Sequence, residues 1–186
     1  MDRTAAGKSG STVSGALSNP PGLDRLFTVA YEELKRLAAS VSRDDRGMTL
    51  SPTALVNEAW VKLSQSPTLQ FESHLHFRSI AARAMRQVLV EAARRRRATR
   101  RGADPAFVTF DDDIGKATAG ADDIVALNDA LDELALLSPR QAEMIEARFF
   151  GGFDTVEIAT LLGISEATVL RDWRAARAWL ARELRS

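Results

Sequence analysis

Arginine side chains are clustered in one segment of this sequence. Between Arg78 and Arg101 it holds nine Arg against one Glu, a net of +8. Guanidinium groups pair with phosphate oxygens and release counterions from a nucleic-acid backbone. Cations near a helix end can instead simply complement the helix dipole. Six Arg within the eight residues 94 to 101 exceed what a dipole needs, so the segment predicts phosphate binding.

A second group of candidate side chains lies between residues 154 and 184. Apolar residues recur at helical spacing on both sides of Gly163, and Ser165 is placed as the N-cap of the second helix. Asp154 with Glu157 three residues later has the form of a capping box. The pattern predicts a helix-turn-helix whose second helix reads base edges in a major groove. The candidates for this contact are the polar side chains Ser165, Glu166, Thr168, Arg171, Arg174 and Arg177.

The remaining composition excludes several kinds of site. The 186 residues include no cysteine, which excludes disulfides and thiolate zinc sites. His74 and His76 are two residues apart and do not share a helix face, so we expect no metal site. An enzyme acting on nucleic acid is a further alternative, but no phosphate loop, convincing acid pair or nucleophile with a positioned base is recognisable. We therefore expect neither a cofactor nor catalysis.

Hydropathy argues against any membrane insertion. No run approaches eighteen consecutive apolar residues, and the first residues lack the apolar core of a signal peptide. The hydrophobic content of 45% is sufficient for packed cores. We therefore expect a soluble protein of the cytoplasm.

Helical periodicity positions these side chains and predicts an all-α protein. The expected helices span residues 23–41, 52–63 and 73–97, then one begins at 122, one at 139, and the last two fill 154–184. Ser51-Pro52 and Ser138-Pro139 each combine an N-cap with a proline at the first helical position. Ser138 with Gln141 also has the form of a capping box.

Composition divides the chain into four parts. Residues 1–21 are rich in Gly, Ser, Thr and Ala and predict a disordered tail. Residues 22–101 form a first helical domain, and residues 122–186 form a second one that contains the helix-turn-helix. Between them, residues 102–121 mix Gly, Ala, Pro and Asp and predict an acidic linker. The fold class is thus two small helical domains joined by a linker.

The chain is neutral overall but strongly segregated in charge. From Asp104 to Glu133 it carries eight Asp and one Glu against one Lys, a net of −8, directly after the basic segment. One hypothesis is that Asp111 to Asp113 fold back onto Arg94 to Arg101 and mask them in the free protein. The alternative is a solvated acidic tether.

The order of these features, from Leu23 to Leu184, resembles the extracytoplasmic-function (ECF) sigma factors of bacterial RNA polymerase. The sequence T-A-L-V-N-E-A-W, from Thr53 to Trp60, is similar to the family's helix that docks on the polymerase clamp. The stretch from Phe77 to Arg95 is similar to its promoter-melting helix, without the usual tryptophan. L-S-P-R-Q at Leu137 to Gln141 and S-x-x-T-V at Ser165 to Val169 match its region four.

The resemblance implies three binding surfaces. The core-polymerase contacts implied on the clamp-docking helix are Leu55, Asn57, Glu58 and Trp60. The minus-ten promoter contacts implied on the melting helix are Arg78, Arg83, Arg86, Arg94, Arg95, Arg96 and Arg97. The helix-turn-helix would read the minus-thirty-five element, although Leu170 and Asp172 stand where the family often has Lys and Arg. The implied partners are core polymerase, through its clamp coiled coil and flap, promoter DNA and, as a further candidate, an anti-sigma factor.

A LuxR-type transcriptional regulator is the alternative of a different class. Its output domain is similar to the stretch from Leu137 to Leu184, and it would bind an operator without acting as a polymerase subunit. Such regulators usually carry an α/β receiver or ligand domain. No strand-like apolar runs occur between Leu23 and Arg101, which favours the sigma-factor interpretation.

Overall fold

The computed structural model describes residues 23–41, 50–66, 70–99 and 121–184, and their regular structure is entirely α-helical. The helices are α1 (Leu23–Val41), α2 (Pro52–Ser64), α3 (His74–Thr99), α4 (Ala121–Leu137), α5 (Pro139–Gly151), α6 (Thr155–Leu162) and α7 (Glu166–Glu183). The all-α prediction is confirmed. The predicted tail, Asp111 to Asp113, Arg100 and Arg101 lie outside the described residues.

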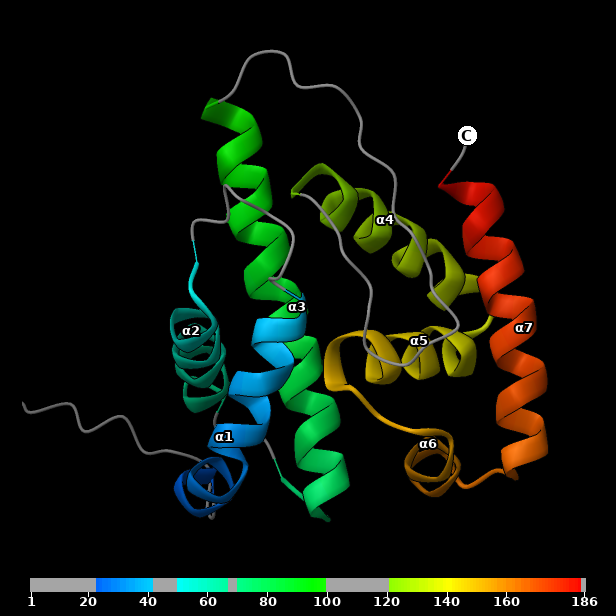
Figure 1. Ribbon diagram of the computed structural model, residues 1–186, viewed down its shortest axis with the longest axis horizontal. Helices are drawn as coiled ribbons and strands as arrows, with labels where there is room; N and C mark the ends of the chain where they lie inside the picture. The colour runs from blue at the N-terminus through cyan, green and yellow to red at the C-terminus, as the bar shows by residue number, and fades with distance from the viewer. Residues whose placement is uncertain (1–22, 42–49, 67–69, 100–120, 185–186) are drawn as a thin grey trace, which may run out of the picture.

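Helix α3 is the central element of the structure. It packs against α1 and α2 on one side and against α4 and α5 on the other (Figure 1). Helix α7 packs on α4, α5 and α6, and α6 also contacts α3. The helices before and after residues 100–120 therefore pack against each other through α3.

Two apolar faces on α3 explain this position. The predicted stripe includes Phe77, Ala81 and Val88, and all three are buried. Ala82 and Met85 are also buried, although they lie outside that stripe. Alanine allows neighbouring helix backbones to approach closely, so the helix can be covered on both sides.

Helix α2 begins and packs as its sequence predicts. The Ser51 hydroxyl accepts a hydrogen bond from the Ala54 amide at 3.2 Å, and Pro52 occupies the first turn. The predicted buried stripe is confirmed, because Leu55 and Leu63 lie in the core. At the surface, Lys62 Nζ lies 2.7 Å from Glu91 Oε1 of α3 and joins the two helices.

The capping box predicted at Ser138 is wrong. Its side chain makes no capping hydrogen bond, although Pro139 does occupy the first turn of α5. Ser138 is the single residue between α4 and α5. Its amide donates to Leu134 O at 2.7 Å, and its carbonyl accepts from the Ala142 amide at 3.1 Å. The backbone of Ser138 therefore hydrogen-bonds to both helices. Its φ of −152° and ψ of 88° differ from the torsion angles of an ordinary N-cap residue.

The end of α5 approaches both α1 and α3 closely. Gly152 ends the helix with φ of 62°, a left-handed conformation that favours glycine. A Cβ atom built at Gly152 would lie 2.2 Å from Leu37 Cδ2, and one built at Gly151 would lie 3.2 Å from Ala82 Cβ. The two glycines thus allow α5 to approach α1 and α3 closely.

Among the described residues, none of the helices combines the length and apolar character that a membrane crossing requires.

Candidate nucleic-acid interfaces

Helices α6 and α7 form the helix-turn-helix that the sequence predicts. The Asp154 carboxylate accepts from the Glu157 amide at 2.8 Å, and Glu157 Oε2 accepts from the Asp154 amide at 3.0 Å, which confirms the capping box. Gly163 follows α6 with φ of 62° and turns the chain. The Ser165 hydroxyl then accepts from the Thr168 amide at 3.2 Å and caps α7. Both helix starts are therefore held by side chains.

The inner face of α7 holds the helix on the rest of the protein. Val169, Ala176 and Leu180 are fully buried. Trp173 is half-buried, and the guanidinium carbon of Arg148 lies 4.5 Å from its ring centroid. Burial lowers the pKa of Arg148 from its ordinary value, and the negative charge of Asp154 opposes this shift.

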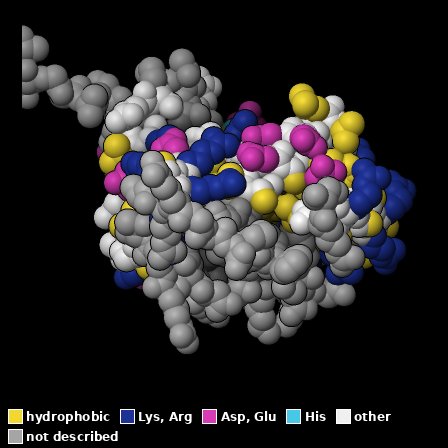
Figure 2. Space-filling view, turned by 90° about the horizontal axis from the view of Figure 1, so that it is seen from above, with side chains coloured by type: hydrophobic (Ala, Val, Ile, Leu, Met, Phe, Trp, Pro, Cys, Tyr) yellow, Lys and Arg dark blue, Asp and Glu magenta, His cyan; other side chains and the backbone are white. Residues whose placement is uncertain are grey.

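The outer face of α7 carries most of the predicted base-reading side chains. Glu166, Arg171 and Arg174 are exposed, and Leu170 beside them is an exposed apolar side chain. Basic side chains gather at the right-hand edge of Figure 2, the side on which α7 lies in Figure 1. These predicted base-reading side chains are therefore accessible to solvent.

Three predicted contacts on α7 have internal roles in this structure. The Ser165 hydroxyl and the half-buried Thr168 hydroxyl lie 3.0 Å apart, so both belong to the cap of the helix. Arg177 is half-buried and engaged in an interaction with the rest of the protein. Ser165 is nevertheless exposed, so the exposed predicted contacts are Ser165, Glu166, Arg171 and Arg174.

Asp172 is the residue of this site that sequence reasoning missed. Its side chain is buried, and its Oδ2 accepts hydrogen bonds from Arg140 Nε at 3.0 Å and Arg140 Nη2 at 2.7 Å. Arg171 Nε lies 3.8 Å from its other oxygen. The Arg140 guanidinium thus connects the start of α5 to the middle of α7 and helps to fix the orientation of α7. A local pattern contains no signal for this pair, because the two residues are 32 positions apart.

Arg78, the first predicted minus-ten contact, is buried rather than presented to solvent. Its Nη1 lies 2.5 Å from Glu157 Oε1, and its Nη2 donates to Gly151 O at 3.1 Å. Its Nε lies 3.1 Å from Glu33 Oε1, and its guanidinium carbon lies 4.3 Å from the Phe153 ring centroid. Arg78 therefore joins α3 to α1 and to the helix-turn-helix.

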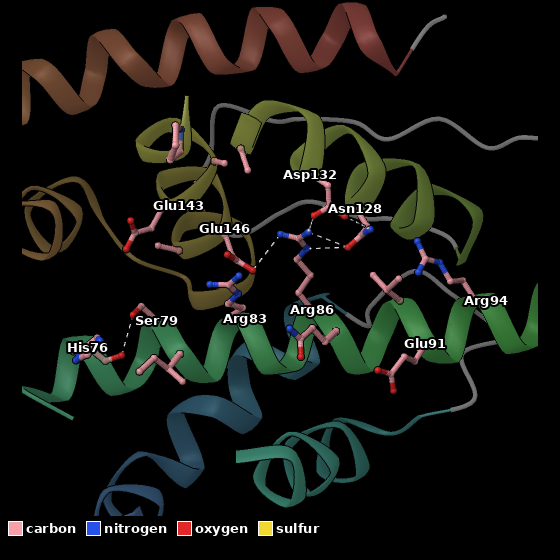
Figure 3. A pocket seen from close by; sticks show the side chains of 17 residues that line it. His76, Ser79, Arg83, Arg86, Glu91, Arg94, Asn128, Asp132, Glu143 and Glu146 are labelled. Carbon is pink, nitrogen blue, oxygen red and sulfur yellow. Dashed lines mark hydrogen bonds and ion pairs between the residues drawn. The ribbon is translucent and has the colours of Figure 1, made fainter. Parts of the chain in front are cut away.

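Arg86 lies at the centre of a polar cluster between α3, α4 and α5 (Figure 3). Its Nε and Nη2 donate to Asn128 Oδ1 at 3.1 and 3.0 Å, and its Nη1 donates to Glu146 Oε1 at 3.3 Å. Its Nη2 also donates to Asp132, and Asn128 Nδ2 donates to the second oxygen of Asp132 at 3.0 Å. Only 14% of the Arg86 side chain is exposed. The group faces a cleft of about 600 Å³ between the three helices.

The other predicted minus-ten arginines differ in accessibility. Arg94 Nη2 lies 3.0 Å from Asp129 Oδ1 of α4, and both side chains are more than half exposed. Arg83 is exposed and lines the cleft beside Glu146. Arg95 is exposed on the distal part of α3. Arg96 and Arg97 also lie there, and both interact with other groups of the protein.

The predicted polymerase contacts on α2 differ in their exposure to solvent. Asn57 and Glu58 are exposed, and Trp60 is half-buried with its ring centroid 4.2 Å from that of Phe27. Leu55 is fully buried in the core and offers no surface to a partner, so its assignment as a contact is corrected to a packing role. The stripe of Leu55, Ala59 and Leu63 faces inward, which turns Asn57 and Glu58 outward.

Burial raises the pKa of the Glu146 carboxyl above its ordinary value. The positive charges of Arg86 and Arg83 and a hydrogen bond from Arg86 oppose this shift, and the negative charge of Glu143 adds to it. Because its pKa is raised, the folded protein favours the neutral carboxyl form of Glu146 over the carboxylate more than the unfolded chain does. The ion pair between Glu146 and Arg86 therefore only partly offsets the cost of burying the carboxylate.

The described residues contain no group of three or more His, Cys, Asp or Glu side chains placed to hold a metal ion. His74 Nε2 lies 3.8 Å from Glu33 Oε2, and His76 Nδ1 accepts from the Glu72 amide at 3.3 Å. Both imidazoles are thus engaged locally at the start of α3.

The described residues form an all-helical protein whose last two helices are a helix-turn-helix. The family model for the ECF sigma factors matches residues 19–186, so the chain belongs to the ECF sigma factor family. Comparison with curated proteins and with solved structures gave no match. Membership supports a role as a sigma factor in transcription initiation, and the family consists of regulatory proteins rather than enzymes. The LuxR-type alternative is not favoured.

Replacing Arg140 with Ala is expected to lower the free energy of unfolding by about 1–2 kcal/mol, because the buried Asp172 carboxylate loses its two hydrogen bonds. Arg171→Ala is the control, since Arg171 is exposed and lies 3.8 Å from the same carboxylate. It should change stability by less than about 0.5 kcal/mol. Urea titration of both variants measures the difference. Equal destabilisation would contradict the positioning role of Arg140.

Replacing Glu146 with Gln is expected to raise the melting temperature at pH 7 to 8, by a few degrees at most. The raised pKa of Glu146 means that the folded protein binds its proton more tightly than the unfolded chain. The contribution of Glu146 to the free energy of unfolding is therefore fully present below the pKa that Glu146 has in the unfolded chain. It is lost as the pH rises through the pKa of Glu146 in the folded protein. Glutamine mimics the protonated form, so the advantage of the variant should shrink towards pH 4.5. Thermal melts across this range provide the test, and a variant less stable than the parent at pH 8 would contradict it.

Proposed function

We propose that the protein binds core RNA polymerase in the cytoplasm and directs initiation at promoters with a minus-ten and a minus-thirty-five element. The observation that carries this proposal is the geometry of α7 within a chain of this family. The helix is capped by Ser165 and fixed from behind by Arg140 through Asp172. Its N-terminal half presents Arg171 and Arg174 to solvent.

The contacts available to this face favour sequence-specific reading. Arginine donates two hydrogen bonds to a guanine edge, and an apolar side chain such as Leu170 contacts a thymine methyl group. Glu166 lies in the first turn, where a carboxylate can accept from the cytosine amino group. Together they support α7 as the minus-thirty-five reader.

The other two proposed binding surfaces lie on helices α2 and α3. We assign α2, through Asn57 and Glu58 with part of Trp60, to the polymerase clamp, because these side chains lie on the outer face of a well-packed helix. We assign the arginines of α3 to the minus-ten element and its melted strand. An anti-sigma factor is a further candidate partner, and either surface would be a suitable target for one.

Replacing Arg171 or Arg174 with Ala should weaken promoter-specific initiation and leave core binding intact. Promoters are first identified by mapping transcripts after overexpression of the protein. If either arginine reads a guanine edge, the loss should be about 1–3 kcal/mol and fall on particular base pairs. Equal loss on all sequences would indicate a phosphate contact instead, and loss of core binding would refute the assignment.

The variant Glu58→Arg should abolish co-purification with core polymerase without unfolding the protein. Glu58 is exposed on α2, so a charge reversal there acts on the partner rather than on the core. Leu55→Ala is the contrasting variant, because Leu55 is fully buried and its truncation should lower stability by about 2–5 kcal/mol. Unchanged affinity of Glu58→Arg for core would refute α2 as the docking helix.

A further inference from the structure

Asp172 of α7 lies between two arginines and turns one carboxylate oxygen towards each of them. Its Oδ2 accepts from Arg140 Nε at 3.0 Å and from Arg140 Nη2 at 2.7 Å. Its Oδ1 lies 3.8 Å from Arg171 Nε, which is an ion-pair distance rather than a hydrogen bond. The side chain of Asp172 is 8% exposed, whereas that of Arg171 is 72% exposed. One carboxylate therefore joins the interior of the fold to the outer face of α7.

The inward position of Asp172 follows from the periodicity of α7. Val169 and Ala176 are fully buried, and Asp172 lies three residues after the first and four before the second, so it shares their face. A carboxylate on that face requires hydrogen-bond donors, which Arg140 supplies. Because Arg140 contacts only Oδ2, the second oxygen remains for the neighbouring Arg171.

The contact with Asp172 distinguishes the two ends of the Arg171 guanidinium group. Nε faces the carboxylate, and the attraction between opposite charges favours conformations that keep it there. The Nη1 and Nη2 groups at the end of the fork are then left for a partner outside the protein. These groups donate in parallel and match the paired acceptors O6 and N7 of a guanine edge. A guanidinium held at Nε is therefore suited to reading guanine with its terminal pair.

Arg174 is the other exposed arginine on this face, and it has no such carboxylate in the part of the chain that the structure describes. Immobilising a long side chain on binding costs free energy, and the cost is smaller for a side chain that is already held. Base reading requires two aligned hydrogen bonds, whereas a phosphate accepts a cation from a wider range of directions. Arg171 and Arg174 are thus suited to different partners.

We propose that Asp172 is a positioning residue for base recognition. It holds Arg171 at Nε so that Nη1 and Nη2 read a guanine, and Arg174 contacts a phosphate. The inference rests on the proposed function, because it takes α7 to be the minus-thirty-five reader. It assigns the guanine contact to one of the two exposed arginines and gives the buried carboxylate a second role besides anchoring α7.

The first test measures base preference in a variant that leaves Arg171 without its acceptor. Holoenzyme is assembled from core polymerase and the full chain, and initiation is measured on a mapped promoter whose minus-thirty-five region is randomised. Asp172→Asn keeps one side-chain oxygen, which the two donors of Arg140 occupy, and turns an amide donor towards Arg171. The preference for a G·C pair at one position should fall by about three- to tenfold.

Arg140→Ala is the matched control, because it removes the anchor of α7 and leaves Asp172 beside Arg171. Its initiation should fall on all sequences by a similar factor, with the preference for G·C at that position retained. Arg174→Ala should also weaken initiation on all sequences. In addition, it should lower the slope of log K against log salt for promoter binding by about 1, because one phosphate contact is lost.

A double-variant cycle shows whether Asp172 acts through Arg171. Arg171→Ala alone should remove the preference for G·C at the same position. Adding Asp172→Asn to Arg171→Ala should then change that preference by less than about twofold, because the guanidinium that Asp172 positions is already absent. Thermal melts establish that each variant is folded.

The second test uses the parent protein and therefore gives a result even where Asp172→Asn does not fold. Nitrogen relaxation of the arginine Nε–H groups in isotopically labelled protein reports the motion of each guanidinium group. The variants Arg171→Lys and Arg174→Lys identify the two signals. The Nε–H of Arg171 should have a higher order parameter than that of Arg174.

Four results would overturn the role of Asp172. Asp172→Asn could show the uniform loss of Arg140→Ala with its base preference intact, or it could still alter the preference when Arg171 is already Ala. Arg171→Ala could leave every base preference unchanged, or the two Nε–H groups could be equally mobile. Failure of the parent to bind core or to initiate would instead refute the proposed function. Normal initiation by the parent together with any of the four results removes only the positioning of Arg171.

Discussion

The burial of a guanidinium group in the middle of the longest helix is the constraint on which this structure depends. Helix α3 carries apolar side chains on two faces, so other helices cover it on both sides. Arg86 is enclosed by that packing, and a buried cation requires paired acceptors. Asn128 and Asp132 of α4 and Glu146 of α5 supply them. The position of α4 and α5 on α3 is thus determined by charge as well as by apolar contact.

The same interaction accounts for the charge balance of the chain. Its net charge is zero, although a segment of net +8 precedes one of net −8. In the described residues, part of this segregated charge is paired across the interface of α3 with α4, as in the contact of Arg94 with Asp129. Carboxylates of α4, further along the acidic segment, thus pair with arginines of α3, whereas the masking hypothesis for Asp111 to Asp113 stays a prediction.

The helix-turn-helix is positioned by a different kind of contact. Its two helices are capped by Asp154 and Ser165, and Arg140 fixes α7 through the buried Asp172. The outer face of α7 consequently presents Arg171 and Arg174 to solvent, although Arg171 Nε lies 3.8 Å from Asp172 Oδ1. A rigid helix with an exposed polar face is the arrangement that base recognition requires, since small errors in position would misalign paired hydrogen bonds.

Local features of this protein were determined by the sequence alone. The helix bounds, the cap at Asp154, the turn at Gly163 and the inward stripe of α2 follow from periodicity and from side chains within a few residues of one another. The family motifs also lie along the chain, and the family match over residues 19–186 agrees with them. Such local patterns do not depend on which distant segments of the chain pack against each other.

Only the tertiary structure decided which predicted side chains remain available for partners. It buried Arg78, paired Asp172 with Arg140, and brought Arg86 against acceptors 42 to 60 positions away. It also removed the expected cap at Ser138, because α4 and α5 share that residue. A charged side chain has no periodic preference for one partner over another. Its role depends on which opposite charge the folded backbone places within hydrogen-bonding distance.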